Sequence, residues 1–255
     1  MPAPSVFDVL LESESEAPRC RLEEEYGAAL LVNAGRVAVN FVSTIDGIVS
    51  LGLADDDSRA VGGGVLADRM LMAMLRAIAG VIVVGAGTLR ATRHHQWTAQ
   101  ALIPERGEDL SRLRAAAARP ADPAPLVVVS GTGDIPADAS AIAHPAVPVH
   151  ILHERALSAA AILEAARKLA SGGPIVCEGG PHLLGSLLEG GVPLELFLTV
   201  APQLVGRSER STERRSLVEG IALPAFSRPA TLRAVRRSQD HLLLRYTIDA
   251  APNDG

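Results

Sequence analysis

Hydrophobic positions follow two different periods along most of the chain. Short, largely apolar runs occupy residues 37–44, 81–84, 125–130 and 174–177, and further strands are expected at 147–152 and 194–200. Such runs are typical of strands buried on both faces of a parallel sheet. Between them lie helical patterns at 66–79, 157–169 and 183–188. The alternation predicts an α/β fold with a mainly parallel central sheet and helices on both faces.

The two ends of the chain differ from this pattern. Residues 231–235 and 241–248 alternate between apolar and polar side chains, which predicts a C-terminal antiparallel hairpin. Residues 1–35 form a weakly patterned N-terminal extension, so the domain proper is expected to span 36–250. The segment 54–64, with three consecutive aspartates and three consecutive glycines, is expected to be a mobile loop.

Composition narrows the functional classes. The formal net charge of −5 disfavours a nucleic-acid partner, which requires a basic face. A secretory leader and an apolar stretch of membrane-spanning length are both missing from the pattern, so a cytoplasmic protein without a membrane partner is expected. Cys20 and Cys177 form neither a disulfide framework nor a metal-binding spacing. The adjacent pair His94-His95 has no third ligand nearby, so no metal site is expected.

Two glycine-rich turns follow apolar strands. Gly85-Ala86-Gly87-Thr88 comes after residues 81–84, and Glu178-Gly179-Gly180-Pro181 comes after residues 174–177. Glycine lets the backbone approach a ligand closely, and a helix beginning at the turn offers free N–H groups to a phosphate. A tight strand-to-helix connection is the alternative for either turn alone. Neither turn has the G-x-G-x-x-G spacing, which disfavours an NAD-dependent Rossmann dehydrogenase.

The turns and their neighbours predict a binding site for NADPH. Arg90, just after the first turn, could bind the adenosine 2′-phosphate, and a solvated helix arginine is the alternative. Ser130 and Gly131 end the next strand and could share that role. The predicted cofactor-binding residues are Gly85, Ala86, Gly87, Thr88, Arg90, Ser130, Gly131, Glu178, Gly179, Gly180, Pro181 and Leu183.

Several motifs in order carry a family resemblance. They are Val39–Gly47, Asp68-Arg69, Leu75-Arg76-Ala77, Gly85–Thr88, Glu178–Pro181 and Leu194-Glu195-Leu196. This set resembles the reductase domain of riboflavin biosynthesis over roughly residues 36–250. The resemblance implies a dihydrofolate reductase-like fold, a homodimer, and NADPH-dependent reduction of a small molecule, 5-amino-6-ribosylamino-uracil phosphate or a related pyrimidine or pterin compound. The zinc-ligand motifs of the deaminase domain found in bifunctional members are absent, so a stand-alone reductase is expected.

Two carboxylates are the predicted catalytic residues. Asp46 follows the first strand in a Ser-x-x-Asp-Gly pattern and is the first candidate for orienting substrate or relaying a proton. The alternative is a turn aspartate that caps its own loop. Glu178 opens the second turn and is expected to point at polar groups of the substrate, with pairing to a neighbouring strand as the alternative.

The predicted substrate-binding residues are Asn40, Ser43, Asp46 and Arg76. Arg76 ends an apolar helix, and an ion pair with Asp68 or another acid is its structural alternative. The family resembled has Lys where this chain has Asn40, and Asp-Asn-Pro where this chain carries the stretch 92–97. This departure motivates a second hypothesis, a nucleotide-binding protein that has lost the substrate site.

Overall fold

The computed structural model describes residues 5–13, 15–53, 57–153, 158–208, 213–221 and 228–250. Its centre is a nine-stranded sheet in the order β1-β10-β11-β8-β2-β7-β4-β5-β6. The six strands from β8 to β6 are parallel, and β11, β10 and β1 extend the sheet in antiparallel pairing. The strands are β1 (Asp8–Glu12), β2 (Val37–Thr44), β4 (Val81–Gly85), β5 (Leu126–Ser130), β6 (Val149–His153), β7 (Ile175–Cys177), β8 (Leu194–Ala201), β10 (Ala230–Ser238) and β11 (His241–Ile248).

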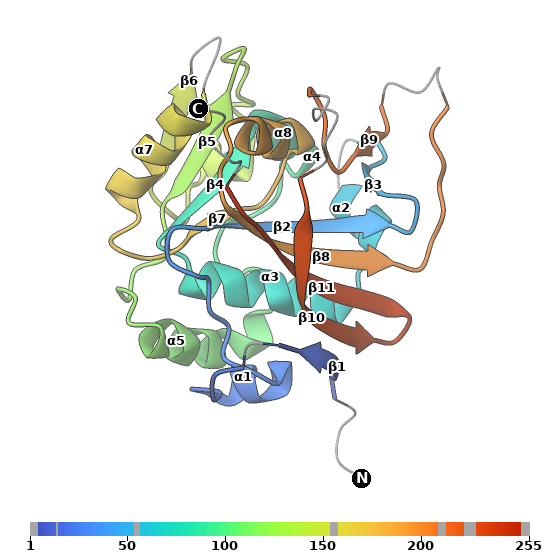
Figure 1. Ribbon diagram of the computed structural model, residues 1–255. Helices are drawn as coiled ribbons and strands as arrows, with labels where there is room; N and C mark the ends of the chain where they lie inside the picture. Colours follow the sequence, from blue (N-terminus) through green and yellow to red (C-terminus); the bar gives the residue numbers. More distant parts are fainter. Residues whose placement is uncertain are drawn as a thin grey trace.

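Helices cover both faces of this sheet (Figure 1). On one face lie α1, α3 and α5, and on the other lie α7 and α8. The helices are α1 (Arg21–Tyr26), α2 (Asp57–Gly62), α3 (Leu66–Ile78), α4 (Ala86–Ala91), α5 (Gly107–Ala116), α6 (Ser140–Ala143), α7 (Ala159–Leu169) and α8 (Pro181–Glu189), with a 3-10 turn η1 (Pro104–Arg106). The predicted α/β fold class is therefore confirmed, with a mainly parallel central sheet, flanking helices and a C-terminal antiparallel hairpin.

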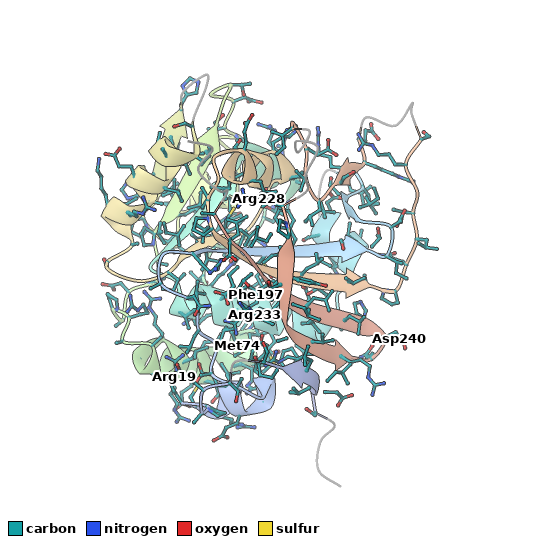
Figure 2. All side chains as sticks on the ribbon, viewed as in Figure 1. Arg19, Met74, Phe197, Arg228, Arg233 and Asp240 are labelled. Carbon is teal, nitrogen blue, oxygen red and sulfur yellow. The ribbon has the colours of Figure 1, made fainter. Side chains whose placement is uncertain are left out.

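Two hydrophobic cores explain why the central strands are apolar on both faces. In β4, Val81, Ile82, Val83 and Val84 are all buried, and their side chains alternate between the two cores. The core under α3 includes Met74 and, from β8, Phe197, both labelled in Figure 2. Because each central strand packs on two helical layers, it lacks the polar alternation of a half-exposed strand.

One expectation about the local structure was wrong. The expected loop at 54–64 contains α2 over Asp57–Gly62, and residues 54–56 lie outside the described part of the chain. The N-terminal extension contributes β1, which pairs with β10, and it adds Phe7 and Leu22 to the core.

The parallel strands place several loops at one edge of the sheet. The register pairs Val39 of β2 with Cys177 of β7, and Val83 of β4 with the same Cys177, so β4 and β7 end close together while β2 runs on past them to Thr44. Beyond the end of β2, the short strands β3 (Ile48–Ser50) and β9 (Arg215–Ser216) pair as a separate two-stranded sheet (Figure 1). This edge is where ligands of open α/β sheets bind.

Within the described residues, no helix combines the length and the apolar character needed to cross a lipid bilayer.

Candidate functional site

The two glycine-rich turns are bonded to each other. The hydroxyl of Thr88 accepts a hydrogen bond of 3.1 Å from the backbone N–H of Gly180, and the N–H of Gly85 donates to the carbonyl of Gly179 at 3.0 Å. Gly179 and Gly180 have φ angles of 115° and 39°, and a Cβ on Gly179 would lie 3.0 Å from the Thr88 hydroxyl. Glycine is therefore required both by the backbone conformation and by the approach of α4.

Two neighbouring cavities meet at this junction. Gly87, Gly180, Pro181 and Arg215 line both of them, so the joined turns form the wall between the two spaces. Each of the twelve predicted cofactor-binding residues lines at least one of the two cavities. Residues far apart in the sequence are thus brought to one place by the parallel topology.

The cavity beyond β4 and β5 is suited to an anion. Its lining includes Gly85, Arg90, Ser130, Gly131 and Arg215. Among the described residues that line it there are two arginines and no carboxylate, although the whole chain carries a net charge of −5. A local excess of positive charge beside free helix N-terminal N–H groups is the arrangement that binds phosphates. We call this space the anion cavity.

The two arginines of the anion cavity have different partners. Arg90 donates to the backbone carbonyl of Asp134 at 2.8 Å and lies 3.4 Å from its carboxylate, at a largely exposed rim. Arg215, on β9, lies 3.2 Å from Nε2 of His182, the second residue of α8. Arg215 is therefore held directly over the N-terminus of α8, whereas Arg90 stands at the outer edge.

The second space, which we call the substrate cavity, lies between β2, α3 and the stretch 92–97. Its lining comprises Asn40, Phe41, Val42, Val49, Ser50, Asp57, Ser58, Asp68, Met72, Arg76, Gly87, Thr88, Ala91, Thr92, His95, Trp97, Glu178, Gly179, Gly180, Pro181 and Arg215. The cavity is mixed in character, with apolar side chains, three carboxylates and two arginines. The substrate cavity and the anion cavity lie on opposite sides of the joined turns.

A buried ion pair joins two of the predicted site residues. Arg76 Nε lies 2.8 and 3.0 Å from the carboxylate oxygens of Glu178, and Arg76 Nη2 lies 2.6 Å from one of them. Only 1% of the Arg76 side chain and 3% of the Glu178 side chain are exposed. The structure thus selects an ion pair for Arg76, with Glu178 rather than Asp68 as its partner. The carboxylate of Glu178, expected to face the substrate's polar groups, is occupied by this guanidinium.

The remaining donors of Arg76 hold the stretch 92–97 against α3. Arg76 Nη1 donates to the carbonyls of Gln96 and Thr98 at 3.1 and 3.2 Å. Arg76 Nη2 lies 2.8 Å from His95 Nε2, and the guanidinium carbon is 4.8 Å from the ring centroid of Trp97. Burial and the neighbouring Arg76 charge lower the pKa of His95 to about 3. His95 is therefore neutral at physiological pH.

Asp68 contributes a carboxyl group to the substrate cavity, and the surroundings of this group shift its pKa. Burial raises the pKa of Asp68 above its usual value, and the charge of Glu178 acts in the same direction. The hydroxyl of Thr199 and the ring of His241 act against that rise. A carboxyl group in this environment holds its proton to higher pH, which is the property of a general acid.

Two predicted site residues lie away from both cavities. Asp46 is bound by the hydroxyl of Thr44 at 2.6 Å and by the backbone N–H of Gly206 at 2.7 Å, and the Thr44 hydrogen bond is the first cause of its lowered pKa. These contacts support the turn-aspartate alternative for Asp46, now extended to the loop after β8. Ser43 is buried and lines neither cavity. Asn40 lines the substrate cavity.

The helical period of the sequence could have identified Asp68 as a site residue. Asp68, Met72 and Arg76 are four residues apart along α3, so they share one helix face, and all three line the substrate cavity. Arg215 carried no such signal. It follows a long connection after β8 and reaches the site only because β9 pairs with β3.

Comparison with known proteins agrees with this geometry. The sequence model of the RibD C-terminal domain matches residues 36–236. No curated protein sequence matches the chain at a comparable level.

Several solved structures share the fold. A pyrimidine reductase-like protein from Corynebacterium diphtheriae is 20% identical, with a TM-score of 0.59, over 91% of this chain and 99% of that one. RibD from Acinetobacter baumannii is 18% identical, with a TM-score of 0.60, over 85% of this chain and 58% of that one. A deaminase/reductase from Thermotoga maritima is 17% identical, with a TM-score of 0.56, over 84% and 56%. This chain therefore spans a little over half the length of the two latter proteins.

Proposed function

Since this chain belongs to the family of RibD C-terminal domains, which indicates an oxidoreductase, we propose that it reduces a pyrimidine compound of the riboflavin-biosynthesis type with NADPH. The observation that carries the proposal is the pair of cavities on either side of the joined turns. A dinucleotide is long enough to require two such spaces, with its phosphates at the glycine turns between them.

The anion cavity fits the phosphate-bearing half of the cofactor. It combines backbone N–H groups at the beginning of α4 and α8 with Arg90 and Arg215. We assign Arg90, at the outer rim, to the adenosine 2′-phosphate, and Arg215 to the pyrophosphate beside α8. A charge-assisted hydrogen bond to Arg90 contributes about 1.5–3 kcal/mol, so NADPH should be preferred to NADH by roughly ten- to a hundredfold.

The substrate cavity provides what the reduction needs from the protein. When bound, the dihydronicotinamide supplies a hydride. The proposed reduction at the anomeric carbon of the ribosylamino group would break the ring C–O bond, and the ring oxygen would take up a proton. We assign Asp68 as the donor of this proton, because burial raises its pKa. The Arg76–Glu178 pair keeps the wall formed by residues 92–97 in place.

The proposal is tested by mixing the protein with NADPH and 5-amino-6-ribosylamino-uracil phosphate and following the nicotinamide absorbance band. Oxidation of NADPH is expected, with NADH much less effective. Dihydrofolate in place of the pyrimidine tests the related pterin substrate. Tight NADPH binding without NADPH oxidation in either mixture would instead support the nucleotide-binding alternative. An equal preference for NADH would refute the role of Arg90.

Two further parts of the proposal concern the protein in solution. The family resemblance implies a homodimer, and light scattering on the purified chain should report twice the mass of 26.6 kDa. A cytoplasmic location stays a prediction, which fractionation of cells expressing the chain would check.

A further inference from the structure

His95 occupies a defined place in the wall of the substrate cavity. It lies on the connection between α4 and η1, and its ring is 5.0 Å from that of Trp97, tilted by 56°. Its Nε2 is 2.8 Å from Arg76 Nη2. Arg76 is itself held by Glu178, which lies in the glycine-rich turn before α8. The ring therefore cannot turn without breaking a contact to a buried and paired guanidinium.

This contact determines which ring nitrogen carries the proton. A guanidinium has only donors, so the Nε2 that faces Arg76 must accept. The neutral ring then carries its proton on Nδ1. Among the described residues, no hydrogen bond to Nδ1 is formed, and His95 lines the substrate cavity. The imidazole thus offers one N–H donor and no charge to whatever binds there.

A second residue of the same cavity also lacks a partner. Asn40 is 8% exposed, and its Oδ1 is buried without a hydrogen bond among the described residues. An unsatisfied buried amide oxygen costs stability, so its retention in a cavity wall indicates that a ligand supplies the donor. The neighbouring Arg76 does not change this polarity, because its charge is neutralised by Glu178.

We propose that His95 is a specificity-determining residue whose Nδ1–H donates to an uncharged carbonyl-type acceptor of the substrate, while Asn40 Oδ1 receives an N–H from it. This inference rests on the proposed function, since it places the substrate in this cavity. The His95 end of the cavity then selects an uncharged amide-like ring edge rather than a phosphate. The carboxylate of Asp57, which lines the same space, also disfavours an anion there.

The tautomer can be tested without any ligand. NMR of protein labelled with ¹⁵N-histidine should show one ring with its proton on Nδ1 that does not titrate between about pH 5 and pH 8. The signal is assigned by its loss in His95→Gln. A proton on Nε2, or an imidazolium that forms within that interval, would overturn the proposal.

Two variants separate the ligand contact from the contact to Arg76. His95→Asn places an amide N–H near the position of Nδ1 and loses the group that faces Arg76. His95→Gln keeps an acceptor near the position of Nε2 and loses the donor. Binding is measured with diaminouracil, an uncharged ring with carbonyl and N–H groups, in the presence of saturating NADPH. Loss of one hydrogen bond predicts about tenfold weaker binding for His95→Gln and a change within about threefold for His95→Asn.

The outcomes are distinguishable. If His95→Gln binds diaminouracil as tightly as the wild type, or His95→Asn is the weaker of the two, His95 acts only through Arg76 and the proposal fails. If the wild type binds NADPH but not diaminouracil, the proposal also fails while the cofactor half of the proposed function stands. If the wild type binds no NADPH, the proposed function itself fails. Unchanged NADPH affinity in both variants shows that they fold.

Discussion

Thr88 and Gly180 connect the two glycine-rich turns through one hydrogen bond of 3.1 Å, from the Gly180 N–H to the Thr88 hydroxyl. The bond joins residues 92 positions apart, at the ends of two different parallel strands. It sets the spacing of the two helix N-termini that would hold a pyrophosphate. In the proposed binding mode neither turn is a complete phosphate site alone, so their relative position is part of the proposed site.

The first prediction concerns this bond. Thr88→Val keeps the shape of the side chain but leaves the Gly180 N–H without its acceptor. A hydrogen bond contributes about 0.5–1.5 kcal/mol, so the dissociation constant for NADPH should rise roughly three- to tenfold. Titration followed by nicotinamide fluorescence measures the change. Thr98→Val is the matched control, because the Thr98 hydroxyl accepts only locally, from the Ala101 N–H at 3.1 Å. Equal effects of both substitutions would contradict the prediction.

The second prediction concerns Arg215, which lines both cavities. Arg215→Gln removes the positive charge over the N-terminus of α8 and should weaken NADPH binding by about tenfold or more. Because salt screens charge pairs, the variant should also lose part of the salt dependence of NADPH affinity. Isothermal titration at two salt concentrations measures both effects.

Arg207→Gln serves as the control for that experiment. Arg207 lies in the same segment and donates to the Ser216 hydroxyl and to Glu219, but it lines neither cavity. It should leave NADPH affinity and its salt dependence unchanged. Identical behaviour of the two variants would show that Arg215 acts only by holding the loop.

How much of this could be predicted from the sequence depends on how local each feature is. The strands and the glycine turns were predictable because their signals lie within a few consecutive residues and parallel strand ends share an edge. The partner of Arg76 was not, since Glu178 is 102 residues away and only the crossing of α3 with the second turn brings the two together. Arg215 was missed for the same reason. Asp46 was assigned from its turn, and its backbone partners at 205 and 206 belong to a distant loop.

The third prediction tests the ion pair between Arg76 and Glu178. Arg76→Leu leaves the buried carboxylate of Glu178 without its partner, which should lower the free energy of unfolding by about 3–5 kcal/mol. Urea denaturation measures the loss. The double variant Arg76→Leu/Glu178→Leu removes both charges and should recover a large part of the stability while remaining inactive. If the double variant is as unstable as the single one, the contacts to residues 96 and 98 carry the stabilisation instead.

The last prediction concerns Asp68→Asn, which should lower turnover and raise the melting temperature. Asp68→Asn cannot release a proton, so turnover should fall at least about a hundredfold, the lower range for general acid catalysis. In the wild type, activity should decline as pH rises through the raised pKa of Asp68, and this limb should be absent from the residual activity of the variant. A raised folded pKa means that the carboxyl stabilises the fold below its unfolded pKa, and that this stability is lost as pH rises through the folded pKa.

The same substitution should therefore raise the melting temperature at pH values above the raised pKa of Asp68, where the carboxyl is ionised, and raise it less below that pKa. Asp57→Asn is the matched control, because Asp57 lines the same cavity but accepts hydrogen bonds from the backbone N–H groups of Leu51 and Leu53 at 2.8 and 3.4 Å. It should lower the melting temperature and keep the pH limb of activity. A variant Asp68→Asn that is both less stable and still pH-dependent would show that Asp68 supports the fold, and that the proton comes from another group.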